Sequence, residues 1–368
     1  MTIIEEFASI VEIRKGRKIY LRKVILNGCC NPSVVNKDVA AASTANTEPN
    51  IQIIFVHGIC GTEQQFQLLL QSMDDQLSSS SSSSSSSQSS TAHSSTTIAC
   101  WLYDQVGCGQ SPTLPNYNDY TYEETQADLK ALLLAEQQNQ TMHQHFPTPC
   151  WTLPTIVVGH SYGPSLFIPL LSEDPNLLLL LPNIIGFILI NTSVRCPHLP
   201  IADGGHYIMK LPIFLLQCIQ SPLTDAFIHM AVHPHHTELR NIIRIASQKN
   251  NMFVAKYYHQ NSKWMTVSQL QMAAGGRRSS TGSNNKKDLV PTLIIHGTND
   301  GVTPIECGQY MYNQLLLIAS SSDDNKNEQR NNTPPVTFIA IDEASHMVMI
   351  EQPHQTAQAI LHFIKPLL

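Results

Sequence analysis

Short, nearly continuous apolar runs recur along the chain, and segments with helical spacing lie between them. Continuous runs of this length are typical of strands that are buried on both faces, as in a parallel sheet. We predict strands at residues 51–58, 97–105, 154–159, 183–191, 290–297 and 336–342. Helices are predicted at residues 63–77, 121–138, 163–172, 307–319 and 356–364. This alternation predicts an α/β protein with a mostly parallel sheet and helices on both faces.

The rest of the chain departs from this alternation. Residues 7–25 have the pattern of two strands around "RKGRK", with Gly16 at the turn. Residues 31–50 are polar and interrupted by proline, so we predict a loop. Residues 198–268 are mostly helical in pattern, and we predict that they form a helical cap inserted into the domain.

Three polar segments cannot contribute to a core. Ten consecutive serines begin at residue 78, and the Ser/Thr-rich stretch continues to residue 97. Residues 275–287 and 320–335 are rich in Ser, Asn and charged side chains. Segments that bury no apolar surface do not offset the entropy cost of ordering. We therefore predict one domain over residues 1–368, with disordered insertions at these three places.

Composition narrows the class of protein. The 368 residues are 42% hydrophobic, which is ample for a large core, and the net charge is -6. A mildly acidic chain gives no reason to expect nucleic acid or an anionic membrane as partner. Peripheral membrane contact and the oligomeric state stay open. The nine cysteines are scattered with no C-x-x-C pair, which is typical of reduced, intracellular thiols.

Neither the start of the chain nor its most apolar stretch predicts membrane targeting. The segment "MTIIEEFASI" has two glutamates and no basic region, unlike a signal or transit peptide. Pro182 and Asn183 interrupt "NLLLLLPNIIGFILIN", and neither half reaches the ~20 residues that span a bilayer. We expect a soluble, cytoplasmic protein without a transmembrane segment.

The segment "IVVGHSYGPS" places Ser161 in a Gly-x-Ser-x-Gly turn between a predicted strand and a predicted helix. Gly159 and Gly163 flank the serine, and such a turn lets the chain pass close to neighbouring backbone and exposes the hydroxyl. The alternative is a glycine-rich turn with a helix-capping serine. The strand before the turn and the helix after it favour a nucleophile.

A serine nucleophile in acyl transfer also needs two backbone N–H donors for the oxyanion. One donor is expected from Tyr162, the residue after the serine. The other is expected from the loop "FVHGICGT", where Ile59 is the candidate and Gly58 permits close approach of backbone. An ordinary glycine turn is the alternative for this loop.

The acid of a catalytic triad is expected at the end of a later strand. Asp300 lies just past the predicted strand at 290–297, in "TLIIHGTNDGVTP". Asp174 and Asp225 are competitors, but both lie far from a strand end. The strand end "FILINTS" carries Asn191 and no carboxylate, which favours Asp300.

The base is expected in the loop after the last strand. His346 lies four residues past Asp342, in "FIAIDEASHMVMIEQP". Among sixteen histidines this one is distinguished by its position. His57 and His160, beside the turn glycines, are expected to be structural or to line a pocket, and His296 to be buried and hydrogen-bonded.

Two other motifs carry residues that could form a chemical site. Asp104 and Cys108 lie in "YDQVGCGQSP", where we expect Asp104 to organise a loop and no base accompanies Cys108. Four histidines in "HMAVHPHH" lack a close carboxylate or cysteine, which makes a metal site weak; they are His229, His233, His235 and His236. We expect no metal and no cofactor.

Five segments together resemble the α/β-hydrolase superfamily: "FVHGICGT", "YDQVGCGQS", "GHSYGPS", "HGTNDGVTP" and "EASHMVMIEQP". The resemblance implies the α/β-hydrolase fold with a nucleophile, an acid and a base at Ser161, Asp300 and His346. Their order along the chain is the order of that family. The segments "GHSYG", "LPIFLLQCIQSPLTDAF" and "SHMVMIEQP" resemble, more narrowly, the abhydrolase-domain-containing protein 8 family.

The motifs predict a serine hydrolase that cleaves a carboxylic ester, a thioester or a lipid acyl bond through an acyl-enzyme. The apolar runs "IMKLPIFLLQCI" and "FIHMAVH" of the cap would favour an apolar acyl or aromatic group, or would only pack on the core. Two other hypotheses stay open. One is a binding or scaffold protein without turnover, and the other is an aminopeptidase-like enzyme that uses a cap carboxylate (Asp203, Asp225 or Glu238).

Overall fold

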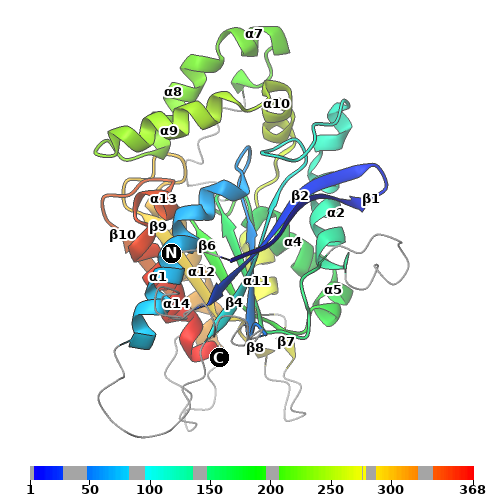
Figure 1. Cartoon of the computed structure of the whole chain (residues 1–368). Coiled ribbons are helices and arrows are strands. Elements are labelled where there is room, and N and C mark those ends of the chain that lie inside the picture. Colours follow the sequence, from blue (N-terminus) through cyan, green and yellow to red (C-terminus); the bar gives the residue numbers. More distant parts are fainter. Residues whose placement is uncertain are drawn as a thin grey trace, which may run out of the picture.

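The computed structural model has an eight-stranded sheet at its centre, in the order β1-β2-β4-β3-β5-β6-β9-β10 (Figure 1). It describes residues 4–27, 48–82, 96–135, 147–195, 207–275, 277–278, 287–321 and 335–368. The strands are β1 (Ile4–Arg14), β2 (Arg17–Asn27), β3 (Ile51–Val56), β4 (Thr97–Asp104), β5 (Thr155–His160), β6 (Ile184–Ile190), β9 (Thr292–Gly297) and β10 (Val336–Ile341). All neighbours from β4 to β10 are parallel, whereas β2 pairs antiparallel with both β1 and β4. The prediction of a mostly parallel α/β sheet is confirmed.

The two faces of the sheet are covered by different helices, because side chains alternate along each strand. On β3, Ile54 and Val56 belong to one hydrophobic cluster, while Ile53 and Phe55 belong to the other. The first cluster includes residues of α2 (Tyr122–Leu133), α4 (Pro164–Glu173), α11 (Val267–Gly275) and α12 (Ile305–Ser321). The second includes α1 (Gln67–Ser82), α13 (Val348–Glu351) and α14 (Pro353–Ile364). Helices therefore pack on both faces, as predicted.

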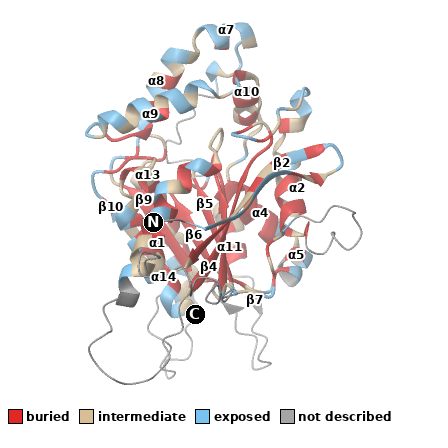
Figure 2. Cartoon of the chain, viewed as in Figure 1, coloured by how far each residue is buried: buried red, intermediate tan, exposed pale blue. Residues whose placement is uncertain are grey.

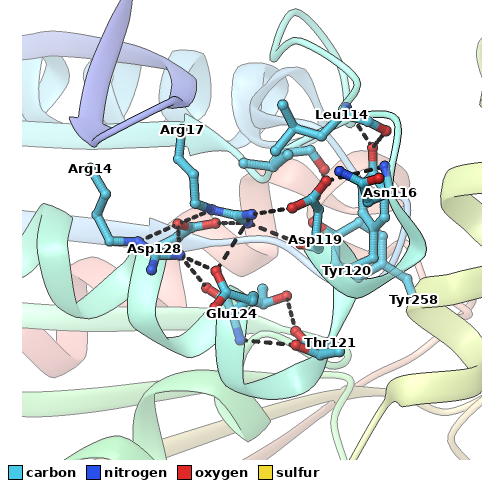
Figure 3. A network of polar contacts seen from close by, with 12 residues as sticks. Arg14, Arg17, Leu114, Asn116, Asp119, Tyr120, Thr121, Glu124, Asp128 and Tyr258 are labelled. Carbon is cyan, nitrogen blue, oxygen red and sulfur yellow. Dashed lines mark hydrogen bonds and ion pairs between the residues drawn. The ribbon is translucent and has the colours of Figure 1, made fainter.

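The β1–β2 hairpin is fastened to α2 by buried ion pairs (Figure 3). Asp128 of α2 accepts hydrogen bonds from Arg14 at 2.6 and 2.9 Å and from the Nε of Arg17 at 2.6 Å. Arg14 also bonds Glu124, one turn earlier on α2. Asp128 and Arg17 are both buried, so each charge depends on the other for the stabilisation that water no longer provides.

Four short helices stand over the carboxyl end of the sheet (Figure 1): α7 (Ile213–Cys218), α8 (Gln220–Ala231), α9 (Thr237–Gln248) and α10 (Met252–Asn261). We call residues 207–262 the cap. Most of its outer residues are exposed, in contrast to the sheet below (Figure 2). Ile228, Ala231, Val232 and Ile243 form a small buried cluster of its own.

The predicted insertions differ from the structure at their edges. Helix α1 continues to Ser82, because adding a residue to an existing helix costs far less than starting one. Thr97 is buried as the first residue of β4. Arg277–Arg278 pair with Lys287–Asp288 as β7 and β8 within the predicted linker. Residues 83–95, 279–286 and 322–334, like most of the predicted loop at 31–50, lie outside the described residues.

Sequence periodicity did not reveal two short helices, α5 (Pro175–Leu180) and α13. Both occupy less than two helical turns, which is too short for a repeating apolar face to be recognised. In the part of the chain that the structure describes, none of the helices has the length and apolar character needed to cross a bilayer.

Candidate active site

Ser161 lies in a strained turn between the end of β5 and the start of α4. Its φ is +55°, in the left-handed region that non-glycine residues seldom occupy. The turn is held because the Ser161 amide donates to the Ile190 carbonyl at 2.9 Å, and the Thr192 hydroxyl donates to the Ser161 carbonyl. A Cβ on Gly163 would overlap the Val56 carbonyl oxygen, so only glycine fits there. Gly159 is equally confined, because a Cβ there would lie 2.6 Å from the ring of Pro164.

The structure brings Ser161, His346 and Asp300 together from three strand ends. The Ser161 Oγ lies 2.9 Å from Nε2 of His346, and Nδ1 of His346 lies 2.9 Å from Oδ2 of Asp300. An ionised carboxylate only accepts hydrogen bonds, so Nδ1 carries the proton and donates to it. Nε2 is then free to accept the hydroxyl proton of Ser161. The three groups thus form a continuous chain of hydrogen bonds, in which His346 is placed to act as a base.

Asp300 is held in its ionised form although it is buried. Burial alone raises the pKa of a carboxyl, but His346, His296 and the Asn191 amide act against it, and the net pKa of Asp300 lies below its usual range. Oδ1 accepts from the amides of Val302 and Thr303 at 2.8 and 2.9 Å. Asp300 can therefore orient the imidazole and stabilise its cation throughout a reaction.

Asn191 and Thr303 are the residues of this site that the sequence reasoning missed. The Asn191 side chain donates to Oδ2 of Asp300 at 2.7 Å and to the Ser345 carbonyl at 3.1 Å. The Thr303 hydroxyl lies 2.8 Å from the same Oδ2. In the sequence, Asn191 is marked only as a strand end without a carboxylate. Its position on the strand next to the serine was the available signal, because a polar residue at that edge faces the same space.

Two other buried histidines stay neutral and support the turns. Burial lowers the pKa of His160 to about 3, with His346 as a further cause, and burial lowers that of His57 to about 4. His160 donates from Nε2 to the His346 carbonyl at 2.9 Å and holds that backbone in place. His57 donates to the Gly58 carbonyl and accepts from the Gln105 amide. Both histidines have the structural role that their place beside the turn glycines predicted.

The predicted oxyanion donors lie beside the serine with their amides unpaired. A Cβ on Gly58 would lie 2.8 Å from the Cβ of Ser161, so the loop that carries Ile59 packs against Ser161. Within the described residues, neither the Ile59 amide nor the Tyr162 amide donates to another group. The Tyr162 ring points away and packs on Trp264, while its hydroxyl accepts from the Lys263 amide. Tyr162 can thus serve the site only through its backbone.

Asp104 organises the loop that carries Ile59. Its carboxylate accepts from the Glu63 amide and the Gln110 amide, both at 2.7 Å. Burial raises the pKa of this carboxyl, and the two amides counteract the rise. Asp104 therefore ties the loop after β3 to the loop after β4, which is the role expected from the sequence.

Glu351 joins the histidine loop to the cap. Its carboxylate accepts from the Ser345 amide at 2.8 Å and from the His233 amide at 2.5 Å. The Met347 amide bonds the Ala231 carbonyl of α8 at 3.2 Å, on the other side of His346. The loop that carries the base is thus fixed to the cap on both sides of the histidine. Glu351 contacts the backbone on both sides of the cap boundary but not the His346 ring, so any effect it has on the site is through the position of His346.

The competing candidates are engaged elsewhere. Asp174 caps α5 and pairs with Lys130, and Asp225 pairs with Arg244 at 2.7 Å on the cap surface. Asp203 lies outside the described residues. The rings of His233, His235 and His236 pack on one another, but among the described residues no three metal-ligand side chains are placed to hold an ion.

A relay of this kind on a parallel sheet invites comparison with known families. Residues 53–359, most of the chain, match the family described as the alpha/beta hydrolase family. The chain belongs to the alpha/beta hydrolase family. The fold predicted from the five sequence motifs is therefore confirmed.

Within this alpha/beta hydrolase family, the chain is similar to Protein ABHD8. The Homo sapiens protein is 25% identical over 208 residues, which cover 56% of this chain and 38% of that protein. The Bos taurus protein is 24% identical over the same length, and 39% of it is covered. The narrower resemblance read from the cap segment agrees with these matches, although they span less than half the length of the relatives.

Solved structures share the fold over nearly the whole chain. A bromoperoxidase from Bacillus anthracis superposes with a TM-score of 0.59 at 13% identity, covering 98% of this chain and 100% of that one. An esterase from Thermogutta terrifontis gives 0.56 at 15% identity, with 100% and 99% covered. The enol-lactonase from Burkholderia xenovorans LB400 gives 0.58 at 13% identity, with 97% and 100% covered. At these identities the likeness establishes the fold.

Proposed function

We propose that this chain is a serine hydrolase that cleaves a carboxylic ester, a thioester or a lipid acyl bond. The observation that carries the proposal is the relay of two 2.9 Å hydrogen bonds from Ser161 through His346 to Asp300. A serine hydroxyl by itself is a weak nucleophile, and this relay supplies the base that activates it. Ester, thioester and lactone carbonyls are among the groups that such a serine attacks.

The chemistry proceeds in two halves. In the first, the Ser161 Oγ bonds to the acyl carbon while His346 Nε2 takes the hydroxyl proton, and the amides of Ile59 and Tyr162 donate to the oxyanion. The tetrahedral intermediate breaks its bond to the leaving oxygen or sulfur, which receives the proton from His346. In the second half a water loses its proton to His346 and attacks the acyl carbon. Ser161 recovers the proton, and the carboxylic acid leaves.

The position of the cap favours a substrate with an apolar acyl group. The Met230 carbonyl accepts from the Gly301 amide and the Ser345 hydroxyl, so the end of α8 lies beside the triad loops. The Met230 side chain is partly exposed there. Met230 is therefore our candidate within the cap run "FIHMAVH" for contact with an acyl chain.

Turnover of graded substrates tests the proposal. Wild-type protein and Ser161→Ala are assayed with p-nitrophenyl esters of increasing chain length, acyl thioesters and aminoacyl anilides. We expect hydrolysis of esters or thioesters by the wild type and a loss of at least about 10⁴-fold in Ser161→Ala. A folded wild type without turnover would favour a binding or scaffold protein, and preference for anilides would favour a peptidase.

A further inference from the structure

The outer tip of the cap concentrates the apolar side chains that the molecule leaves exposed. Eighteen large apolar residues are exposed in the described part of the chain, and nine of them lie between residues 207 and 245. Five are clustered at residues 207–215, which we call the cap apex: Tyr207, Ile208, Leu211, Phe214 and Leu215. In Figure 1 this segment leads into α7, the helix farthest from the sheet. Such clusters of exposed apolar residues mark binding surfaces.

The cap is also basic, although the whole chain is acidic. Residues 207–262 hold five lysines or arginines and two acids, a net charge of +3 with histidine neutral. Because the whole chain carries -6, the remainder carries -9. Asp225, one of the two acids, is neutralised by Arg244. The overall charge, which argued against an anionic partner, therefore conceals a cationic cap.

Cations lie beside exposed apolar side chains both at the cap apex and on α9. Lys210 lies between Ile208 and Leu211 in sequence, is itself exposed, and holds its ammonium 4.8 Å from the centre of the Tyr207 ring. Lys249, at the end of α9, is exposed as well. On α9, Ile242 and Ile245 are 63% and 59% exposed, although apolar side chains of this size are usually buried. Amphipathic helices with lysine beside aromatic and aliphatic residues bind the interface of anionic bilayers.

We propose that the cap apex docks on a bilayer surface that contains anionic phospholipid. Tyr207 and Phe214 would enter the interfacial layer, while Lys210 would lie among the headgroups. A second copy of this chain fits the face less well, because a two-fold contact would set one cationic cap against another. Docking would hold the carboxyl end of the sheet, where Ser161 lies, toward the lipid. That consequence rests on the proposed function, whereas the docking itself does not.

Vesicle flotation of the full chain tests this proposal. The probes are phosphatidylcholine vesicles without and with about one third phosphatidylserine. We expect wild type and Ser161→Ala to float at least about fivefold more on the anionic vesicles, and raised salt to release them. The double variant Tyr207→Ser with Phe214→Ser is expected to lose about tenfold or more of this binding. The double variant Lys210→Glu with Lys249→Glu is expected to bind anionic vesicles more weakly, with its binding to pure phosphatidylcholine vesicles unchanged.

The matched control is Leu317→Ser with Met272→Ser, because Leu317 is 61% exposed and Phe214 is 60% exposed. Leu317 lies near the end of α12, which runs away from the cap, so vesicle binding is expected to be unchanged. Thermal unfolding checks that each variant is folded, and hydrolysis of a short soluble ester is a second check for the variants that keep Ser161. Wild type that does not float, or a Tyr207/Phe214 variant that floats equally well, overturns the proposal. A dimer that this variant abolishes, without vesicle binding, assigns the cap apex to a second copy instead.

The two proposals fail separately. Wild type that floats but hydrolyses no ester would remove the proposed function and leave the docking surface. Wild type that hydrolyses soluble esters but never floats would remove the docking surface and leave the proposed function.

Discussion

Asp300 and Asp128 are both buried carboxylates, but they have very different partners. Asp300 follows β9, whereas Asp128 lies on α2. Asp128 faces the guanidinium groups of Arg14 and Arg17, which carry a permanent charge (Figure 3). Asp300 faces the imidazole of His346 and neutral donors on Asn191 and Thr303. The two sites have similar burial, so burial does not distinguish them.

What distinguishes the two carboxylates is whether a neighbour can exchange a proton. An arginine cannot lose its proton in a protein, so Asp128 can only hold the hairpin to α2. His346 can gain one from Ser161, and Asp300 is placed to stabilise the resulting cation. The comparison teaches that a buried ion pair is structural or chemical according to its partner.

The largest expected effect is that of Asp300→Asn on activity. The amide NH₂ would face Nδ1 of His346 and turn the imidazole into the tautomer whose Nε2 carries hydrogen. Nε2 could then no longer accept the Ser161 proton. We expect kcat/KM for an ester to fall by about 10⁴-fold, measured by steady-state kinetics on folded protein. A loss of less than about tenfold would remove Asp300 from the relay.

Asp128→Asn should show the opposite pattern. Removing this charge leaves Arg17 buried without its main counter-ion, and breaking a buried pair costs about 3–5 kcal/mol. We expect the free energy of unfolding in urea to fall by about that much. The kcat/KM of the remaining folded protein should stay within about threefold of wild type. Full stability in this variant would mean that the hairpin is held by packing alone.

The neutral histidines around the relay predict a dependence of stability on pH. His160 and His57 have folded pKa values of about 3 and about 4, below the ordinary value of 6.5. As the pH falls below 6.5, the unfolded chain therefore binds protons that the folded chain does not, and stability decreases. Each histidine contributes a loss of about 1 kcal/mol per pH unit, down to its folded pKa. Urea unfolding of wild type and His57→Gln, between about pH 7 and about pH 5, measures how the free energy of unfolding changes with pH.

The Asp300 carboxyl should not contribute to this slope, because its folded pKa lies below the usual range. Its stabilisation is present above its unfolded pKa near 4 and is lost only as the pH falls further. The decline between pH 7 and 5 should therefore belong to the histidines and be shallower in His57→Gln. Equal slopes in the two proteins would contradict the assignment.

The smallest effect is expected at Glu351. Glu351→Gln keeps one acceptor oxygen and loses the charge that holds the Ser345 and His233 amides. We expect kcat to fall by about tenfold, with KM for a short soluble ester little changed and about 1 kcal/mol less stability. Glu351→Asp should restore less than half of the loss, because its shorter side chain does not reach both amides. A change in KM alone would mean that Glu351 shapes the cap rather than the histidine loop.

The sequence was sufficient for the parallel core, and it singled out three side chains that the structure places within hydrogen-bond distance of one another. Continuous apolar runs are what strands buried on both faces require, and the order of strand ends put Ser161, Asp300 and His346 at one edge. These signals are local, because each depends on a few adjacent residues. Strand and helix positions followed from them within a few residues.

The sequence was not sufficient for contacts that join distant segments. Arg17 and Asp128 are more than a hundred residues apart, and nothing in either segment indicates the other. Glu351 became a positioning residue only once the cap and the histidine loop were seen in contact. The cap charge was hidden because an overall net charge says nothing of where the charges lie.

Covalent labelling with a fluorophosphonate tests the central claim most directly, because this reagent reacts with a serine only where a base activates it. Wild type is incubated with the probe, digested and examined by mass spectrometry beside Ser161→Ala and Asp300→Asn. We predict one adduct, on the peptide that carries Ser161, absent in Ser161→Ala and formed far more slowly in Asp300→Asn. A folded wild type that stays unlabelled, or an adduct on another residue, would contradict the relay as the source of function.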